Sequence, residues 1–168
     1  NQACTFTSYT YTTQAGMQSY TWGFPGTAGV NYNIISGGTS TSNTATVQFL
    51  TAGTQTVSIN YLNASGCTST GPVNTSITVQ ATAQIAPLAG TQTVCAGATV
   101  NFSTTSTGGT WSSSNPAVAT VNPNTGVVTG VAAGTATMTY TVTNANGCSN
   151  AVSFTMNINA TPVLTAIA

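Results

Sequence analysis

Two alternating segments flank a short polar turn near the C-terminus: Ala136-Thr-Met-Thr-Tyr-Thr-Val-Thr-Asn-Ala-Asn-Gly-Cys-Ser-Asn-Ala-Val-Ser-Phe-Thr-Met-Asn-Ile158. Apolar side chains stand at every second position on both sides of the turn: Ala136, Met138, Tyr140 and Val142, then Val152, Phe154, Met156 and Ile158. Successive side chains of a β-strand point to opposite faces, so each segment would place its apolar residues on one face. We therefore predict two β-strands, each with one buried face and one polar face.

The turn in this segment is one of two copies. Asn63-Ala-Ser-Gly-Cys67 recurs as Asn144-Ala-Asn-Gly-Cys148, 81 positions later. The first copy also lies between alternating segments, with Val57, Ile59 and Tyr61 before it and Ile77 and Val79 after it. Self-similarity at a fixed period is the signature of repeated structural units. We therefore interpret the chain as two links of a longer array.

Both ends of the chain fit this interpretation. Ala81-Thr82, with Ile85 and Leu88 after it, is echoed by Ala160-Thr161 with Leu164 and Ile167. The last nine residues thus resemble the start of a further unit, and we interpret Asn1 as a point of excision from a longer protein. We place the first domain at 1–82, a short semi-rigid linker at 83–89, the second domain at 90–160, and the start of a following linker or repeat at 161–168.

Further alternating segments fill both domains. Their apolar sets are Tyr20, Trp22 and Phe24; Val30, Tyr32 and Ile34; Ala45, Val47 and Phe49; and Val100 and Phe102. Clusters of Gly, Pro and Asn separate the segments, as at 37–38, 108–109 and 122–126. Short strands with such punctuation are typical of β-sandwiches, and no segment shows a sustained helical pattern. We predict an all-β fold.

The 168 residues include no Asp, Glu, Lys, Arg or His. General acid–base catalysis near neutral pH needs one of these side chains, as do Schiff-base and carboxylate-pair mechanisms. Calcium and magnesium sites need carboxylates, and most zinc sites need His or several Cys. We therefore expect no enzymatic activity, no catalytic residues, no bound metal and no cofactor.

The missing charges also restrict the partners. Without Lys or Arg the chain cannot neutralise phosphate groups, so we expect no nucleic-acid partner. No apolar run approaches the roughly 20 residues that cross a bilayer, so we expect no membrane insertion. The chain has 37 Thr, 16 Ser and 16 Asn, which indicates that neutral hydrogen-bonding groups solvate the sheet surfaces.

Part of the first domain resembles a known family. The segments Tyr20-Thr-Trp-Gly-Phe-Pro-Gly26 and Ala52-Gly-Thr-Gln-Thr-Val-Ser-Ile-Asn-Tyr-Leu-Asn-Ala-Ser-Gly66 together resemble a PKD-like domain. Gly23, Pro25 and Gln55 stand where that family commonly has Asp, Gly and Tyr. The resemblance implies a PKD-like β-sandwich over 1–82, without a role for acidic residues.

A longer segment of the second domain resembles another family. Trp111-Ser-Ser-Ser-Asn-Pro-Ala-Val-Ala-Thr-Val-Asn-Pro-Asn-Thr-Gly-Val-Val-Thr-Gly-Val-Ala-Ala-Gly-Thr-Ala-Thr-Met-Thr-Tyr140 is similar to the bacterial Ig-like domain of group 2. Together the two resemblances imply two tandem Ig-like β-sandwich domains. They also imply a large secreted protein of the bacterial cell surface, with an adhesive or spacing role and with neighbouring repeats of the same chain as partners.

Four cysteines divide into two per domain. Three pairings are formally possible, and the repeat favours Cys4–Cys67 and Cys95–Cys148. Such disulfides indicate an oxidising compartment, in agreement with secretion. A metal site is the first alternative, but it would need all four Cys to converge, and no Cys-x-x-Cys pair exists. A reactive thiol is the second, and it would have no base or cation beside it.

The aromatic residues allow two interpretations. Trp22 and Trp111 stand where sandwiches commonly bury a large ring, and we favour core packing for both. The alternative is a stacking platform for sugars, made of Trp22, Trp111, Tyr20 and Tyr32 with amide and hydroxyl groups beside them. A third hypothesis is ice or crystal-surface binding by a row of hydroxyls, which a sandwich would simply turn toward solvent: Thr135, Thr137, Thr139, Thr141 and Thr143.

These observations favour a non-catalytic function. Our leading hypothesis is a structural spacer or adhesive repeat module of a secreted bacterial surface protein, stabilised by one disulfide per domain. The alternative is a carbohydrate-binding module that uses exposed aromatic and amide side chains. Candidate partners outside the chain are therefore surface glycans or a host or substratum surface.

Overall fold

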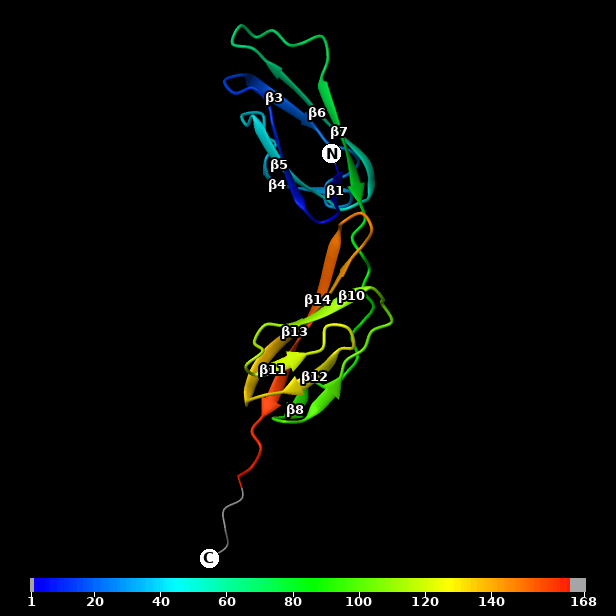
Figure 1. The fold of residues 1–168 in the computed structure, drawn as a ribbon. Helices are drawn as coiled ribbons and strands as arrows, with labels where there is room; N and C mark the ends of the chain where they lie inside the picture. The colour runs from blue at the N-terminus through cyan, green and yellow to red at the C-terminus, as the bar shows by residue number, and fades with distance from the viewer. Residues whose placement is uncertain (1, 164–168) are drawn as a thin grey trace, which may run out of the picture. The chain divides into compact units, whose positions relative to one another are not determined.

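The structure is a computed structural model that describes residues 2–163 and divides the chain into two compact units, Asn1–Thr82 and Ala83–Ala168 (Figure 1). The described residues form β-strands, turns and extended segments, without a helix. This confirms the prediction of an all-β fold. Of the segment predicted to begin a further repeat, 161–168, residues 164–168 lie outside the described residues.

Two sheets make up the first unit (Figure 1). The four-stranded sheet has the order β1-β7-β6-β3, with bounds Gln2–Cys4, Val73–Gln80, Gly53–Leu62 and Gln18–Gly23. The three-stranded sheet has the order β2-β5-β4, with bounds Ser8–Thr12, Thr44–Phe49 and Tyr32–Gly37. Their apolar faces meet in one core, which makes the unit a β-sandwich.

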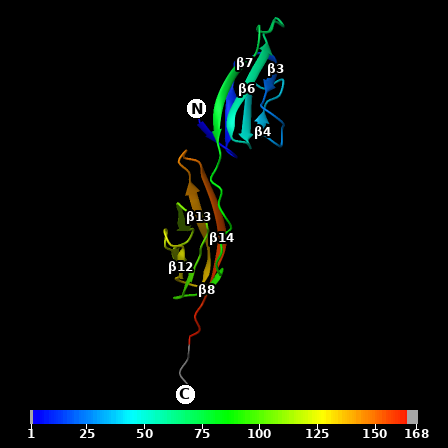
Figure 2. The same ribbon diagram turned by 90° about the vertical axis from the view of Figure 1, so that its right-hand side faces the viewer.

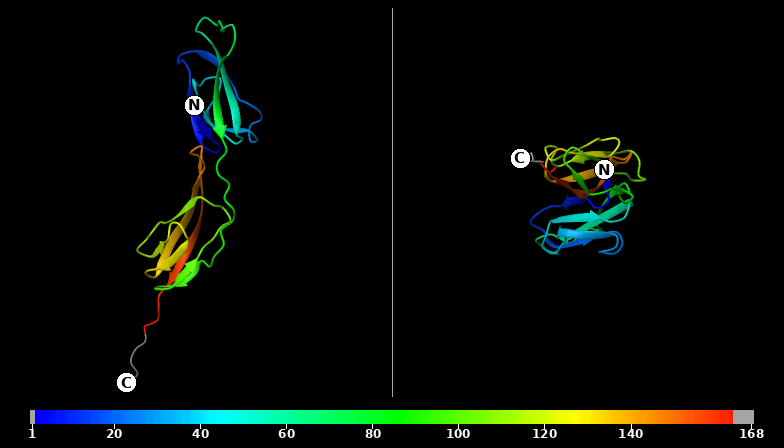
Figure 3. Two further views of the ribbon diagram at one scale, coloured as in Figure 1. Left: turned by 45° about the vertical axis from the view of Figure 1, so that its right-hand side comes forward. Right: turned by 90° about the horizontal axis from the view of Figure 1, so that it is seen from below.

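The second unit repeats this plan (Figures 2 and 3). Its four-stranded sheet has the order β10-β13-β14-β8, with bounds Gly109–Ser113, Gly134–Thr143, Ser149–Asn159 and Thr93–Cys95. Its three-stranded sheet has the order β11-β12-β9, with bounds Ala119–Val121, Val127–Gly130 and Thr99–Asn101. The first strand along the chain in one unit occupies the same place in its sheet as the first strand of the other unit, and the same holds for each later strand. The sequence repeat is therefore also a repeat of topology.

The first strand of each unit pairs in parallel with the last. In the first unit β1 lies beside the end of β7, with Cys4 opposite Gln80. In the second unit β8 lies beside the end of β14, with Cys95 opposite Asn159. The amide of the next residue continues each ladder, because Thr5 N donates to Gln80 O and Ala96 N donates to Asn159 O, both at 2.9 Å.

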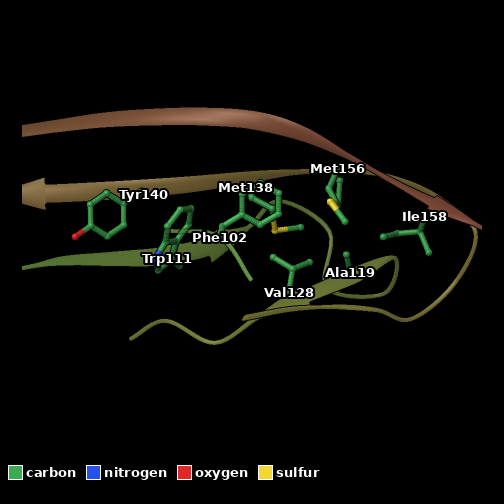
Figure 4. Close-up of a cluster of buried hydrophobic side chains, with 9 residues drawn as sticks. Phe102, Trp111, Ala119, Val128, Met138, Tyr140, Met156 and Ile158 are labelled. Atoms are coloured by element: carbon green, nitrogen blue, oxygen red, sulfur yellow. The ribbon is translucent and has the colours of Figure 1, made fainter. Parts of the chain in front are cut away.

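The alternating segments form the cores as expected. In the first unit the centre is β5, whose Ala45, Val47 and Phe49 are fully buried. In the second unit Met138 of β13 and Met156 of β14 pack against Val128 from the opposite sheet, and all three are fully buried (Figure 4). The Thr residues on the opposite face of β13 are exposed or half-exposed, as a solvent-facing row requires.

One predicted apolar face is wrong. Val30 is 65% exposed and Ile34 is 43% exposed, while Tyr32 is half-buried. Val30 precedes β4 in a turn, where its amide donates to Thr27 O at 3.1 Å. The register of β4 against β5 also shifts between Ile34 and Ser36. Alternation therefore does not continue through this strand, which lies at the edge of its sheet.

Residues 83–89, predicted to be a linker, contain no strand and run against the second unit. Ile85 and Leu88 pack on its hydrophobic core. The segment also exchanges polar contacts, because Ala86 N donates to Ser106 Oγ at 2.8 Å and Thr104 Oγ1 donates to Ala86 O at 3.1 Å. The two apolar side chains thus hold the extended segment on this unit.

Candidate functional site: the cysteine-bearing ends of the two units

The repeated Asn-Ala-x-Gly-Cys motif forms the same turn in both units. In the first, Asn63 Oδ1 accepts hydrogen bonds from Ser65 N at 3.0 Å and Cys67 N at 2.9 Å. In the second, Asn144 Oδ1 accepts from Asn146 N at 3.1 Å and Cys148 N at 3.0 Å. Asn is suited to this position because its short side chain can hydrogen-bond the backbone two residues further on.

Glycine is required in each turn by its backbone conformation. Gly66 and Gly147 both have a φ of 78°, in the left-handed region that residues with a Cβ rarely adopt. The turn is closed by the backbone as well, because Asn63 N donates to Cys67 O and Asn144 N donates to Cys148 O. Each motif therefore holds its cysteine in a defined position at the connection between two long strands.

The other two cysteines lie at the ends of the first strands. Cys4 ends β1 and Cys95 ends β8. A turn follows Cys95, in which Ala98 N donates to Cys95 O at 3.0 Å and Gly97 has a φ of 84°. The four cysteines thus occupy two kinds of position: the hairpin turns hold Cys67 and Cys148, and the first strands hold Cys4 and Cys95.

The predicted pairing Cys4–Cys67 and Cys95–Cys148 is wrong. Cys67 and Cys95 are free and exposed, whereas Cys4 and Cys148 are disulfide-bonded. The prediction that each unit closes a disulfide between its own two cysteines therefore fails. Of the four cysteines predicted to be disulfide-bonded, Cys4 and Cys148 are bonded and Cys67 and Cys95 are not.

The sheet topology explains why the predicted pairing fails. Cys4 lies beside Gln80 at the end of β7, but Cys67 precedes Val73 at the start of that strand. At about 3.3 Å per residue the eight residues of β7 separate Val73 from Gln80 by roughly 23 Å. Cys67 lies beyond Val73, because its neighbour Thr68 pairs with Leu62 past the Ile59–Val73 end of the ladder. A disulfide needs Cα atoms within about 7 Å.

The same argument applies to the second unit. Cys95 lies beside Asn159 at the end of β14, and Cys148 precedes Ser149 at its start. Figure 2 shows β8 beside that end of β14. The eleven residues of β14 separate the two positions by roughly 33 Å. The sequence pattern does not show which end of the last strand lies beside the first strand. The separation of the two cysteines was therefore not predicted.

Two of the four predicted sugar-stacking residues are buried. Trp111 is 6% exposed and packs beside Tyr140, with ring centroids 4.8 Å apart (Figure 4). Tyr20 is 5% exposed, and its hydroxyl donates to Gln14 O at 2.7 Å. The interpretation of Trp111 as a core residue is confirmed, and neither ring offers an open face to a sugar.

Trp22 and Tyr32 are half-buried and are joined through Phe24. The ring of Phe24 stacks on Trp22 at 6.4 Å and lies 5.1 Å from Tyr32. The Trp22 indole donates from Nε1 to Ser42 O at 2.9 Å, which fixes the ring. Both residues pack against the core of the first unit, so the predicted platform is divided between core and surface.

An open cleft of about 350 Å³ lies beside Trp22 in the first unit. Val73, Thr75 and Tyr11 also line it. The Tyr11 hydroxyl is buried and has no hydrogen-bond partner among the described residues. Burial, together with the neighbouring Tyr9, raises the pKa of Tyr11 above its usual value of 10.0.

Besides aliphatic groups, the side chains of the described residues carry hydroxyl, amide, thiol, disulfide, thioether and aromatic groups. No group of three potential metal ligands lies together within residues 2–163. Over the same residues no helix is long and apolar enough to cross a membrane. The features with defined chemistry are therefore the two exposed thiols and the cleft of the first unit.

Comparison with known families identifies part of the chain. Residues 72–152 match the family model described as bacterial Ig-like domain (group 2). The match begins just before β7 of the first unit and ends within β14 of the second, so its bounds differ from the predicted 90–160. It supports a bacterial Ig-like domain in this part of the chain. A search of curated proteins finds no match.

Several solved structures are similar to this chain over most of its length. A C-terminal intimin fragment, solved with the intimin-binding domain of the translocated intimin receptor, is 20% identical over 90% of this chain and 57% of its own, with a TM-score of 0.38. The D00–D0 domain of intimin is 12% identical over 92% of this chain and 94% of its own, with a TM-score of 0.38.

The surface-layer protein SbsC, domains 1–6, is 19% identical over 89% of this chain, with a TM-score of 0.34. The present chain spans only 22% of that structure. At these identities and TM-scores the likenesses carry no argument about the function of this chain.

Proposed function

We propose that the chain is a non-catalytic structural repeat of a large secreted bacterial surface protein, in which it acts as a spacer or adhesive module. In this proposal residues 1–82 form a PKD-like domain and residues 90–160 a bacterial Ig-like domain. The disulfide-bonded Cys4 and Cys148 suit an oxidising compartment outside the cytoplasm. The family match of residues 72–152 supports the bacterial Ig-like part.

The parallel pairing of first and last strands is the observation that carries the proposal. When a unit is pulled by its two ends, β8 and the end of β14 are drawn in opposite directions along their common axis. The ladder between them is then loaded in shear, so its hydrogen bonds must break together rather than one after another. β1 and β7 offer the same resistance in the first unit. Such pairing suits a module that transmits tension.

Single-molecule stretching tests this function with a matched pair of variants. Ala96→Pro removes the amide that donates to Asn159 O in the β8–β14 ladder. Ala132→Pro removes an amide that donates to Val118 O at 3.2 Å, away from that ladder. A reducing buffer ensures that no disulfide limits extension.

We expect the force that opens one of the two units to fall in Ala96→Pro and to stay near that of the parent chain in Ala132→Pro. The proposal is wrong if the parent chain extends without resolved force peaks. It is also wrong if the two variants lower the opening force equally.

The cleft beside Trp22 favours carbohydrate binding as a second candidate function. It combines an aromatic wall with Thr hydroxyls, which together can stack on and hydrogen-bond a sugar. A glycan array tests it, using Thr75→Val to remove a hydroxyl from the cleft and Thr78→Val as a control on the other face of β7. Binding that only Thr75→Val abolishes would support this function, and an array without binding would remove it.

A further inference from the structure

Each unit carries one cysteine at each end of its last strand. Cys67 lies in the connection that leads into β7 at Val73, and Cys148 lies directly before β14, while the first strands place Cys4 and Cys95 at the other ends of β7 and β14. Neither unit can join its own two cysteines, because the last strand keeps them far apart. A sulfur in either kind of position can therefore bond only to a cysteine outside its own unit.

Both kinds of position support a disulfide. Cys148 is disulfide-bonded in a hairpin turn, and Cys4 is disulfide-bonded at the end of a first strand. Cys67 and Cys95 occupy the equivalent positions of the other unit, where they are free and exposed. Cys67 and Cys95 are thus free thiols at positions whose equivalents in the other unit are disulfide-bonded.

We propose that Cys67 and Cys95 are cross-linking sites for further copies of the same unit. The Cys67 thiol of the hairpin turn in one copy bonds to the thiol at the end of the first strand, the position of Cys95, in another copy. This inference rests on the proposed function as a repeat module. It adds that the array is continued by disulfides in both directions.

The local structure holds both cysteines in defined positions. The turn around Cys67 is held by the two hydrogen bonds to Asn63 Oδ1. Cys95 is held by the ladder to β14 and by the turn that follows it. Because the chain has no charged side chain, two copies can approach end to end without Coulomb repulsion.

The bond requires an oxidant, for which oxidised glutathione serves. A thiolate attacks the glutathione disulfide and releases one reduced glutathione. The second protein thiolate then attacks the mixed disulfide and releases the other. One Sγ–Sγ bond forms and one glutathione S–S bond breaks. The two electrons and two protons of the protein thiols pass to two glutathione thiols.

The test uses the whole chain at high concentration in a glutathione redox buffer. We expect a ladder of disulfide-linked oligomers on a non-reducing gel, which collapses on reduction. Chymotrypsin, which cuts after aromatic residues and Leu, places Cys67 in peptide 63–88 and Cys95 in peptide 89–102. The proposal predicts that these two peptides are joined to each other in the oligomers.

Two single variants give a directional control. Cys95→Ser keeps only the hairpin thiol, and Cys67→Ser keeps only the first-strand thiol. Both sites are exposed, so each variant should melt at the parent temperature. An equimolar mixture should form several-fold more linked dimer than either variant alone.

Two results would overturn the proposal. In one, the parent chain stays monomeric in the redox buffer. In the other, peptides 63–88 and 89–102 are each joined only to a second copy of themselves. Neither result affects the proposed mechanical role, because the stretching experiment is done in reducing buffer. Failure of the cross-link and failure of the spacer function are therefore distinguishable.

Discussion

At the scale of single residues, Asn63 and Asn144 perform the same task 81 positions apart. Each amide oxygen accepts from the backbone two and four residues further on. The recurrence of the motif is visible in the sequence, and so is the need for a turn. The two acceptor contacts are the physical reason why a short side chain with an acceptor oxygen recurs at this position.

Asn144→Ala should lower the free energy of unfolding of the second unit by about 1–3 kcal/mol, because two hydrogen bonds of about 0.5–1.5 kcal/mol each are lost. Asn144→Asp keeps an acceptor oxygen and should lose less. Denaturant unfolding of the two variants measures the difference. Equal losses would show that the acceptor role does not stabilise the turn.

Tyr11→Phe should stabilise the first unit by about 1 kcal/mol, because it removes a buried hydroxyl that has no partner among the described residues. Tyr140→Phe is the control, since the Tyr140 hydroxyl donates to Ser106 O at 2.9 Å and accepts from Gly109 N at 3.0 Å. That variant should lose about 1–2 kcal/mol. Thermal unfolding of the two variants compares their stabilities. A loss of stability in Tyr11→Phe would contradict the prediction.

The same substitution has a consequence in alkaline solution. The raised pKa of Tyr11 means that the folded state resists ionisation of this hydroxyl more than the unfolded state does. The protonated Tyr11 hydroxyl therefore contributes its full stabilisation below pH 10.0, the ordinary pKa of tyrosine. That contribution is lost as the pH rises through the higher pKa of the folded state. Stability should fall less steeply above pH 10 in Tyr11→Phe than in the parent chain.

At the scale of elements, alternation predicted the long strands and their buried faces. It succeeded for β5, β13 and β14 because neighbours on both sides bury one face continuously. It failed at β4, an edge strand with a register shift. Alternation also shows which face of a strand is buried but not which strand lies beside it. The parallel pairing of β1 with β7 and of β8 with β14 was therefore not predicted, and the cysteine pairing that depends on it was predicted wrongly.

The turn between β11 and β12 should be sensitive to a single added methyl group. Gly126 has a φ of 73°, and a Cβ there would meet Phe102 O and, at 2.9 Å, Trp111 Nε1. Gly126→Ala should cost roughly 1–2 kcal/mol for the left-handed backbone and about 1–3 kcal/mol more for the overlap.

Gly147→Ala is the matched control for this prediction. Its φ is 78° and nothing lies within 4 Å of the added atom, so only the backbone cost should appear. Denaturant unfolding followed by Trp fluorescence compares the two variants. Equal destabilisation would mean that Gly126 does not pack closely under Trp111.

At the scale of the whole molecule, the chain lacks any side chain that titrates between about pH 4 and pH 7. Folded and unfolded states then bind nearly equal numbers of protons, so stability should be almost constant over this range. Added salt should have little screening effect. Calorimetry at several pH values checks this, and a melting temperature that moves by many degrees would contradict it.

The central claim is that parallel pairing of first and last strands sets the two cysteines of each unit at opposite ends of a sandwich. It is tested most directly by mapping the cysteines of the native monomer. Thiols are alkylated before reduction and disulfide sulfurs after it, with reagents of different mass, and chymotryptic peptides are then analysed. The account predicts the first label on Cys67 and Cys95 and the second on Cys4 and Cys148. A disulfide joining Cys4 to Cys67, or Cys95 to Cys148, would contradict it.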